Sequence, residues 1–161
     1  RSKSTTASSA SVANVADEYV DLGLPSGTLW KAQNELCGLV THDKAMYMYG
    51  NNLPTKEQFE ELMNACIWTW TKEGYKVMGL NNKTIFFAME KKNCGYWSST
   101  IGDDTDIYSK MFIVKNEQEA AKVKQWIEAS GGLFYKLHCT SKSQQVIMEY
   151  GKQKLCVHLV R

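Results

Sequence analysis

Two capped, amphipathic helices lie among many short strand-like runs, and this order constrains the fold more than any other feature of the chain. Thr55 lies just before one segment with periodic apolar residues, and Gln58 lies three residues after Thr55. This spacing is the pattern of a capping box. Asn116 and Glu119 take the same two positions before the second segment. A parallel sheet requires regular alternation of strands and helices, which this chain lacks. The sequence therefore predicts an α+β domain of two helices and mainly antiparallel short strands.

Each predicted helix has an apolar stripe at spacings of three and four residues. The stripe of the first helix is expected to face a core, and Gly131 after the second helix suits a left-handed C-terminal turn. The stripe residues are Phe59, Leu62, Met63 and Cys66 in the first helix and Ala120, Val123, Trp126 and Ile127 in the second.

The remaining periodic runs predict strands. A Leu-Pro-Ser-Gly turn favours a hairpin over residues 19–34, because proline presets one dihedral angle and glycine accepts a positive one. A second hairpin is expected over residues 75–89, where Asn81 and Asn82 tolerate a left-handed conformation. The other expected strands are residues 107–114, 133–139, 144–150 and 154–160, of which the last three form an antiparallel meander.

The length of 161 residues suits one domain that buries roughly two thirds of the surface exposed by the unfolded chain. Hydrophobic residues make up 43% and charged residues 22%, which is typical of a globular protein and argues against a disordered or fibrous chain. Residues 1–17 are small and polar and predict a flexible leader, either a linker left after removal of a signal or lipoprotein segment or an arbitrary start. Residues 18–161 are expected to form the single domain.

The charge and the hydropathy of the chain argue against nucleic-acid binding and against a membrane span. The net charge is only +2 and no long basic run is present, so the sequence lacks the electrostatic signature of a nucleic-acid-binding protein. No apolar run reaches the roughly 18 to 20 residues that cross a bilayer, so no membrane span is expected in this chain.

The cysteines and histidines do not form a known metal or redox motif. No CxxC pair is present, which argues against a zinc ribbon and a thioredoxin-like centre. Some cysteines could pair in an oxidising compartment, but their number is odd, and small buried thiols are the favoured interpretation. The histidines lie in neither an HExxH motif nor a His/Cys pair at ligand spacing, so no metal ion is expected. These residues are Cys37, Cys66, Cys94, Cys139, Cys156, His42, His138 and His158.

The sequence contains no motif for catalysis or nucleotide binding. Ser98 and Ser99 lack the GxSxG elbow of serine hydrolases, and neither a P-loop nor a GxGxxG after a strand is present. No cofactor is expected, and enzymatic activity is not favoured. The enzymatic alternative is a thiol centre built from Cys94 or Cys139 and a histidine, in which the thiol pKa would be depressed.

An acidic loop and a tryptophan pair are the remaining polar and aromatic features. Asp103, Asp104 and Asp106 have a spacing that calcium could use, but the EF-hand glycine and terminal glutamate are missing, so a solvated turn is favoured. Trp68 and Trp70 alternate with threonines, which places both indoles on one face of a strand. Such a face serves either a core or sugar stacking, and the core is favoured.

Four blocks of the sequence are similar to a known family. They are EYVDLGLPSGTLWKAQN, LPTKEQFEELMNACIWTWTKEGYKVMGLNNKTIFFA, GYWSST and the ending CVHLVR. Together they resemble the Fibrobacter succinogenes major paralogous domain and its relatives in Bacteroidetes, over most of residues 18–112 and the last strand. Those relatives are usually surface or secreted proteins, so the resemblance implies an extracytoplasmic location, at the cell surface or secreted.

The resemblance also implies a C-type lectin-like fold. In that fold the first and last strands pair, so YVDL at residues 19–22 and CVHLV at residues 156–160 are expected to be neighbours. The YWSS block belongs to the framework in similar domains, so Trp97 is expected to be buried. The hydroxyls of residues 98–100 are expected to satisfy backbone groups of a turn.

The chain departs from this family between its third and fourth blocks. The predicted helix over residues 116–130 stands where members have a short polar loop, and it is either a binding feature or a packing insert. The Glu-Pro-Asn, Gln-Pro-Asp and Trp-Asn-Asp signatures of calcium-dependent lectins are absent, which argues against calcium-dependent sugar binding. The catalytic cysteine pattern of formylglycine-generating relatives and a three-histidine iron site are absent too.

These observations favour a non-enzymatic surface or secreted recognition domain that binds a protein or a glycan. The alternative in another class is a structural subunit or spacer of a bacterial surface assembly. Ligand-binding residues are expected in the acidic loop and in the polar turns of the C-terminal meander, where side chains need not serve the core. The candidates are Asp103, Asp104, Asp106, Lys142, Gln144, Tyr150 and Lys152.

Overall fold

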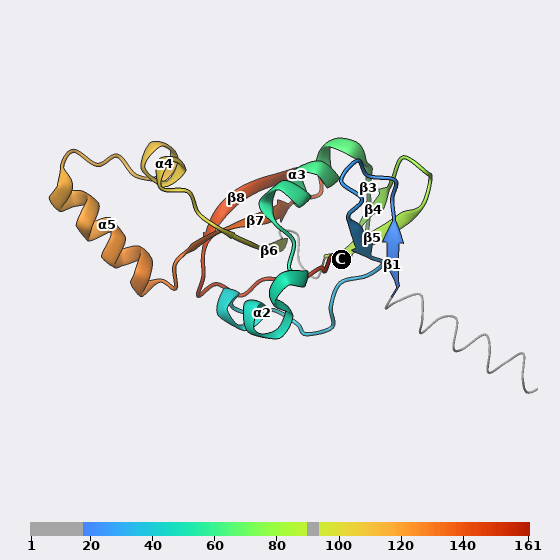
Figure 1. Ribbon diagram of the computed structural model, residues 1–161, viewed down its shortest axis with the longest axis horizontal. Helices are drawn as coiled ribbons and strands as arrows, with labels where there is room; N and C mark the ends of the chain where they lie inside the picture. Colours follow the sequence, from blue (N-terminus) through green and yellow to red (C-terminus); the bar gives the residue numbers. More distant parts are fainter. Residues whose placement is uncertain (1–17, 90–93) are drawn as a thin grey trace, which may run out of the picture.

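The computed structural model describes residues 18–89 and 94–161, so the leader predicted for residues 1–17 lies outside the described residues. The described chain is an α+β domain with antiparallel sheets (Figure 1). The expectation of two helices is wrong, because the Thr41 side chain caps a further eight-residue helix and Asp103 caps a short one. The elements of the domain, in chain order, are β1 (Tyr19–Asp21), β2 (Leu29–Lys31), α2 (His42–Tyr49), the 3-10 helix η1 (Gly50–Asn52), α3 (Lys56–Ala65), β3 (Ile67–Thr71), β4 (Gly74–Met78), β5 (Thr84–Ala88), β6 (Cys94–Ile101), the short α4 (Asp104–Asp106), the π-helix η2 (Ile107–Met111), α5 (Glu117–Ala129), β7 (Leu133–Cys139) and β8 (Gln144–Tyr150).

The described strands form three small sheets. β1 pairs with β2, β4 lies between β3 and β5, and β7 lies between β6 and β8, with every pair antiparallel. The two hairpins predicted from turn residues are therefore confirmed. Asn82 has a φ of 67° in the turn between β4 and β5, which is the left-handed conformation that asparagine tolerates.

The C-terminal residues lie beside β2 rather than beside β1. Leu29 and Arg161 exchange two backbone hydrogen bonds of 3.0 and 2.9 Å. The expected pairing of residues 19–22 with residues 156–160 is therefore wrong, because β2 lies between the two stretches. The two ends are still close together, since the Arg161 guanidinium lies 4.3 Å from the centre of the Tyr19 ring.

Residues 154–160 do not form the continuous strand predicted for them. This stretch pairs with three different segments in turn, so no two-stranded ladder develops along it. Its isolated bridges join Val40 to Leu155, Tyr96 to Cys156, and Trp30 to Val160. The C-terminal segment therefore connects β2, the loop before α2 and β6.

β6 runs between two clusters of buried side chains. Tyr96 packs in one cluster with Phe59 and Phe87, whereas Trp97 packs in the other cluster with Leu53. Successive side chains of a strand point to opposite faces, so a strand covered on both faces buries both aromatic residues. Trp97 is fully buried, which confirms the prediction.

The hydroxyl residues of the GYWSST block lie within β6 rather than in a turn. Ser98 Oγ donates to the carbonyl of Tyr135 at 2.5 Å, and Thr100 Oγ1 accepts from the backbone N–H of Lys56 at 3.0 Å. Their predicted hydrogen bonds with backbone groups are confirmed, but the predicted turn is wrong, because pairing with β7 continues as far as Ile101. Thr100 thereby fixes the first turn of α3 against β6.

α3 begins where the capping box predicts. Thr55 Oγ1 accepts from the backbone N–H of Gln58 at 3.1 Å, and Gln58 Oε1 accepts from the N–H of Thr55 at 2.9 Å. Phe59 and Leu62 are buried on the predicted apolar face. The carbonyl of Leu62 accepts from Nε1 of Trp68 at 3.1 Å, and Trp68 packs half-buried against the core as predicted. The same prediction is wrong for Trp70, which is 37% exposed.

Residues 107–114 do not form the predicted strand. The side chain of Asp103 accepts from the N–H groups of Thr105 and Asp106 at 2.8 and 3.3 Å and starts α4, which continues directly into η2. Strand propensity stabilises a segment only where a partner strand is available, and here β6 pairs with β7 instead. The local cap therefore determines the conformation.

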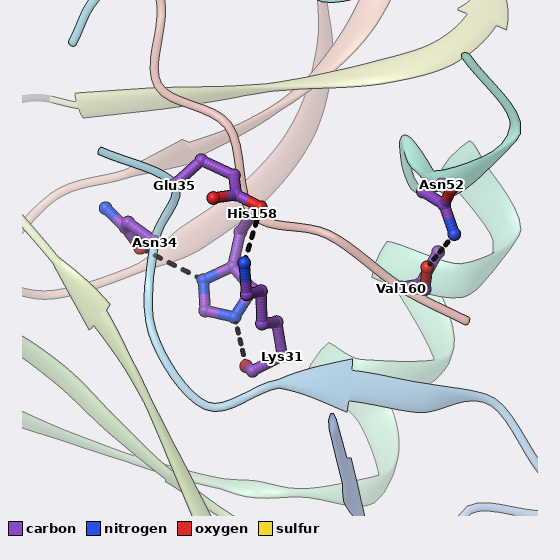
Figure 2. Close-up of polar contacts among 6 residues, drawn as sticks. All are labelled: Lys31, Asn34, Glu35, Asn52, His158 and Val160. Atoms are coloured by element: carbon purple, nitrogen blue, oxygen red, sulfur yellow. Dashed lines mark hydrogen bonds and ion pairs between the residues drawn. The ribbon is translucent and has the colours of Figure 1, made fainter. Parts of the chain in front are cut away.

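A buried polar network joins the C-terminal segment to the loop after β2 (Figure 2). His158 Nε2 lies 2.5 Å from the carbonyl oxygen of Lys31, and Nδ1 lies 3.0 Å from Oδ1 of Asn34. The Lys31 ammonium forms a 2.7 Å ion pair with Glu35. Complete burial, and to a smaller extent the charge of Lys31, lower the pKa of His158 to about 4, so the ring is neutral at neutral pH. Asn52 Nδ2 donates to the last buried carbonyl, that of Val160, at 3.0 Å.

Candidate functional site

Residues 102–132 leave the domain between β6 and β7 and carry α4, η2 and α5, and we call them the α4–α5 arm. Figure 1 shows α4 and α5 at one end of the molecule, away from the sheet of β3, β4 and β5 at the other end. The N–H of Gly102 donates to the carbonyl of Leu133 at 2.8 Å and closes the base of the arm. The arm therefore begins and ends at neighbouring positions.

α5 forms as predicted but lies on the surface. Asn116 Oδ1 accepts from the N–H of Glu119 at 2.9 Å, and Gly131 has a φ of 87° after the last turn. No residue of α5 is buried, and Trp126 is 60% exposed although its ring lies 6.2 Å from that of Phe112. The apolar stripe is therefore only partly covered: Trp126 is exposed, whereas Ala120, Val123 and Ile127 are half-buried.

A hollow of about 270 Å³ lies between α5, the α4–η2 segment and the base of the arm, and we call it the arm hollow. Its lining is mainly apolar, with a few charged groups at Asp104, Lys124 and Glu128. The apolar side chains come from the strand ends and from both helical segments: Ile101, Ile107, Ile127 and Leu133. A mainly apolar hollow with few polar groups is the usual chemistry of a binding site.

A second hollow of about 230 Å³ lies on the other side of the α4–η2 segment, and we call it the sheet hollow. Its lining comes from this segment and from the facing strands β7 and β8. The lining residues are Asp106, Met111, Tyr135, Val146, Ile147 and Met148. The two hollows thus share the α4–η2 segment as their common wall.

Tyr135 fixes this common wall to the sheet. Its hydroxyl donates to Asp106 Oδ2 at 2.5 Å, and Lys56 Nζ lies 4.5 Å from the centre of its ring. Burial and the Asp106 carboxylate raise the pKa of Tyr135 to about 12, so the hydroxyl keeps its proton and remains a donor at neutral pH. The contact therefore holds α4 in place and does not supply a nucleophile.

Replacing Tyr135 with phenylalanine is expected to loosen the α4–η2 segment at a cost of about 1 kcal/mol, because one charge-assisted hydrogen bond is lost. Hydrogen exchange followed by mass spectrometry should show faster exchange over residues 103–112. Tyr75→Phe is the matched control, since its hydroxyl donates to the Thr140 carbonyl at 2.5 Å and lies outside the arm. Equal exchange of residues 103–112 in the two variants would contradict this role of Tyr135.

Most of the residues predicted to bind a ligand lie near the arm. Asp103 caps α4, Asp104 lines the arm hollow and Asp106 lines the sheet hollow. Tyr150 pairs with the residue at the base of the arm, and the N–H of Lys152 donates to the carbonyl that follows α5 at 3.0 Å. The structure therefore brings these five predicted residues to one end of the domain.

Lys142 and Gln144 lie at the opposite end of the β7–β8 hairpin. Gln144 pairs with Cys139, whereas Tyr150 pairs with Leu133 beside the arm. Each strand has seven residues and spans about 20 Å at about 3.3 Å per residue, so these two candidates do not share a binding face with the arm.

The sequence did not reveal the apolar part of this surface. Several large apolar side chains are exposed on the arm and on the strands beside it: Ile101, Met111, Ile113, Trp126 and Ile147. The helical stripe marked one of them, but periodicity identifies an apolar face without showing what covers it. The candidate site is therefore the α4–α5 arm with its two hollows.

The buried thiols and histidines do not support the enzymatic alternative. Burial raises the pKa of the Cys139 thiol, and the neighbouring Cys94 raises it further, whereas a nucleophilic thiol needs a depressed pKa. His42 Nε2 lies 2.8 Å from the Ser98 carbonyl and its ring stacks on Phe134, so it serves the core. Within residues 18–89 and 94–161, no three His, Cys, Asp or Glu side chains are placed to hold a metal ion.

Comparison with protein-family models, with curated proteins and with solved structures finds no match for this chain. Function is therefore argued from the α+β fold and from the geometry of the arm. Among the described helices, none combines the length and the apolar character that crossing a membrane requires.

Proposed function

We propose that this chain is a non-enzymatic recognition domain with a C-type lectin-like scaffold, and that it binds a protein or glycan through the α4–α5 arm. The observation that carries the proposal is the exposure of large apolar side chains around two adjoining hollows at one end of the domain. Large apolar side chains exposed close to a hollow are typical of interaction sites. The similarity of four sequence blocks to surface proteins of Bacteroidetes supports export from the cell.

The arm contributes little to the core of the domain, which supports a role in binding. Ile113 is 93% exposed and no residue of α5 is buried, whereas each face of β6 is covered by a core cluster. Folding alone does not account for the exposure of Trp126 and Ile113, because apolar surface in water gives no stabilisation. A partner that covers the stripe would provide it.

A protein partner fits the chemistry of the arm better than a glycan. Isoleucine and methionine side chains prevail on the exposed surface, and buried cores of protein interfaces are apolar with aromatic anchors such as Trp126. A glycan is the second candidate, because the Trp126 indole can stack on a sugar ring and Asp104 and Glu128 can accept hydrogen bonds from its hydroxyls.

Replacing Trp126 with alanine is expected to weaken binding at least about tenfold while costing less than about 1 kcal/mol of stability, because an exposed aromatic anchor contributes to the interface and not to the core. Ligands would first be selected with the full chain from a peptide display library and a glycan array. Calorimetry would then compare the affinities of the wild type and of the variant for each selected ligand.

Leu80→Ala is the matched control for this measurement. Leu80 is 66% exposed but lies in the turn between β4 and β5, far from the arm in Figure 1. Equal affinity of the two variants would contradict a site on the arm. Absence of any ligand, together with concentration-dependent assembly in sedimentation, would favour the structural subunit of a surface assembly instead. Asp104→Asn is a suitable second variant, whereas Asp103 is not, because its carboxylate caps α4.

A further inference from the structure

Two buried cysteines from distant parts of the sequence lie close together at the start of β6. Cys94 begins β6 and Cys156 lies in the C-terminal segment, 62 positions away. Their sulfur atoms are 3.1 Å apart, about 1 Å more than the length of a disulfide bond. Both side chains lie at the edge of the core cluster that holds Tyr96.

The backbone fixes the two cysteines relative to each other. The N–H of Cys156 donates to the carbonyl of Gly95 at 2.9 Å, and the N–H of Trp97 donates to the carbonyl of Cys156 at 3.2 Å. These hydrogen bonds hold the C-terminal segment parallel to β6, with Cys156 opposite Tyr96, two positions after Cys94. A bond between the sulfurs would require them to move about 1 Å closer, while these backbone hydrogen bonds keep the two segments side by side.

We propose that Cys94 and Cys156 form a structural disulfide in the folded protein. This inference does not depend on the proposed binding function. It differs from the sequence-based expectation of buried thiols, in which the odd number of cysteines left the pairing open. One disulfide among five cysteines leaves three thiols, at Cys37, Cys66 and Cys139.

The oxidant is a disulfide, either glutathione disulfide or the disulfide of an exchange enzyme. A thiolate of one cysteine attacks a sulfur of the oxidant, which forms a mixed disulfide and releases one thiol. The second cysteine loses its proton and attacks the mixed disulfide, which forms the Cys94–Cys156 bond and releases a second thiol. Two cysteine thiols are thus oxidised, and one external disulfide is reduced to two thiols.

Burial determines when this reaction takes place. Cys94 and Cys156 are only 6% and 5% exposed, so an external disulfide reaches them before the core closes. Cys139 pairs with Cys94 in the β6–β7 register and is the competing partner. Burial raises the pKa of the Cys139 thiol, which keeps it protonated and slows its attack on the completed bond.

The bond would enclose the half of the domain that carries the candidate site. Residues 94–156 include β6, the α4–α5 arm, β7 and β8. A cross-link restricts the unfolded chain over this whole loop, and it ties the C-terminal segment to the strand from which the arm departs. Reduction is therefore expected to lower the midpoint of thermal unfolding by about 10 °C.

Peptide mapping of the unmodified full chain tests the proposal. The protein would be refolded in a glutathione redox buffer, alkylated, and digested with trypsin without reduction. Each cysteine lies on a different tryptic peptide, and those of Cys94, Cys139 and Cys156 cover residues 93–110, 137–142 and 155–161. The expected result is a linked pair of peptides 93–110 and 155–161. A link from 93–110 to 137–142 instead, or complete alkylation of both peptides, would overturn the proposal.

Two single variants separate the pairing from general destabilisation. Cys139→Ala should keep the linked pair and the reduction-dependent shift of the unfolding midpoint, because the competing thiol is not part of the bond. Cys156→Ser should lose both. If the shift on reduction is the same in Cys156→Ser as in the wild type, the proposed bond does not cause it and the proposal fails.

Discussion

Replacing Trp97 with alanine is expected to lower the free energy of unfolding by about 4 kcal/mol, because a large buried aromatic side chain leaves a cavity that the surrounding structure fills only in part. The indole lies edge-on to the ring of His42 at 5.0 Å and edge-on to that of Phe134 at 6.5 Å. Its Nε1 donates to the carbonyl of Val40 at 2.8 Å. The variant loses the packing and this hydrogen bond together.

Urea denaturation followed by circular dichroism would measure this loss. Trp126→Ala is the matched control, since it removes the same side chain from a surface position and is expected to cost less than about 1 kcal/mol. Trp97→Phe should fall between the two, because it keeps most of the ring but not the N–H donor. If Trp97→Ala and Trp126→Ala unfold at the same urea concentration, the second core cluster does not depend on Trp97.

Acidification from about pH 7.5 to about pH 5 is expected to remove about 2 kcal/mol of stability through His158. Burial lowers the pKa of this histidine from 6.5 to about 4 in the folded protein, so the unfolded chain binds the proton more tightly. The stabilisation is therefore complete above about pH 6.5 and declines as the pH falls towards 4. Burial also lowers the pKa values of His42 and His138, which gives the same sign.

The hydrogen bond of His158 with the Lys31 carbonyl is the main effect that opposes this shift in pKa, and the Asn34 amide acts in the same direction. Asn34 Nδ2 donates to the Ala88 carbonyl at 3.0 Å, and this contact turns Oδ1 towards Nδ1 of His158. A proton on Nδ1 would give that oxygen a donor, which favours the charged ring. The complete burial of the ring and the adjacent Lys31 ammonium disfavour the charge and are the larger effect.

The pH dependence would be measured by urea denaturation in this range, where histidines titrate and most carboxylates do not. His158→Gln is compared with the wild type by the change in stability with pH, so a lower overall stability of the variant does not affect the test. The variant should lose about 2 kcal/mol less on acidification. Equal losses would show that His158 is not the group responsible.

The sequence predicted the elements whose conformation depends on neighbouring residues. The capping box of Thr55 and Gln58 and the cap at Asn116 act within one turn, so both helices begin where the pattern indicates. The alternation of side chains in residues 107–114 predicts a strand, but the cap at Asp103 is a stronger local signal when no strand pairs with them. The α+β class followed from these local patterns.

Features that depend on distant parts of the chain could not be predicted in the same way. Whether Tyr150 and Gln144 share a binding face depends on the length of the β7–β8 hairpin and on the position of the arm at one of its ends. The exposure of Trp126 depends on the absence of a covering element over α5, which its own periodicity does not encode. The apolar half of the candidate site was missed for this reason.

The hydrogen bond between Gly102 and Leu133 has a consequence for how such a domain can change over time. Because the arm departs and returns through adjacent residues of one strand pair, its thirty or so residues can be exchanged for a loop of another length and composition while β6 and β7 keep their register. Changes within the arm would then leave the folded framework as it is. The α4–α5 arm is thus structurally separable from the β6–β7 framework that carries it.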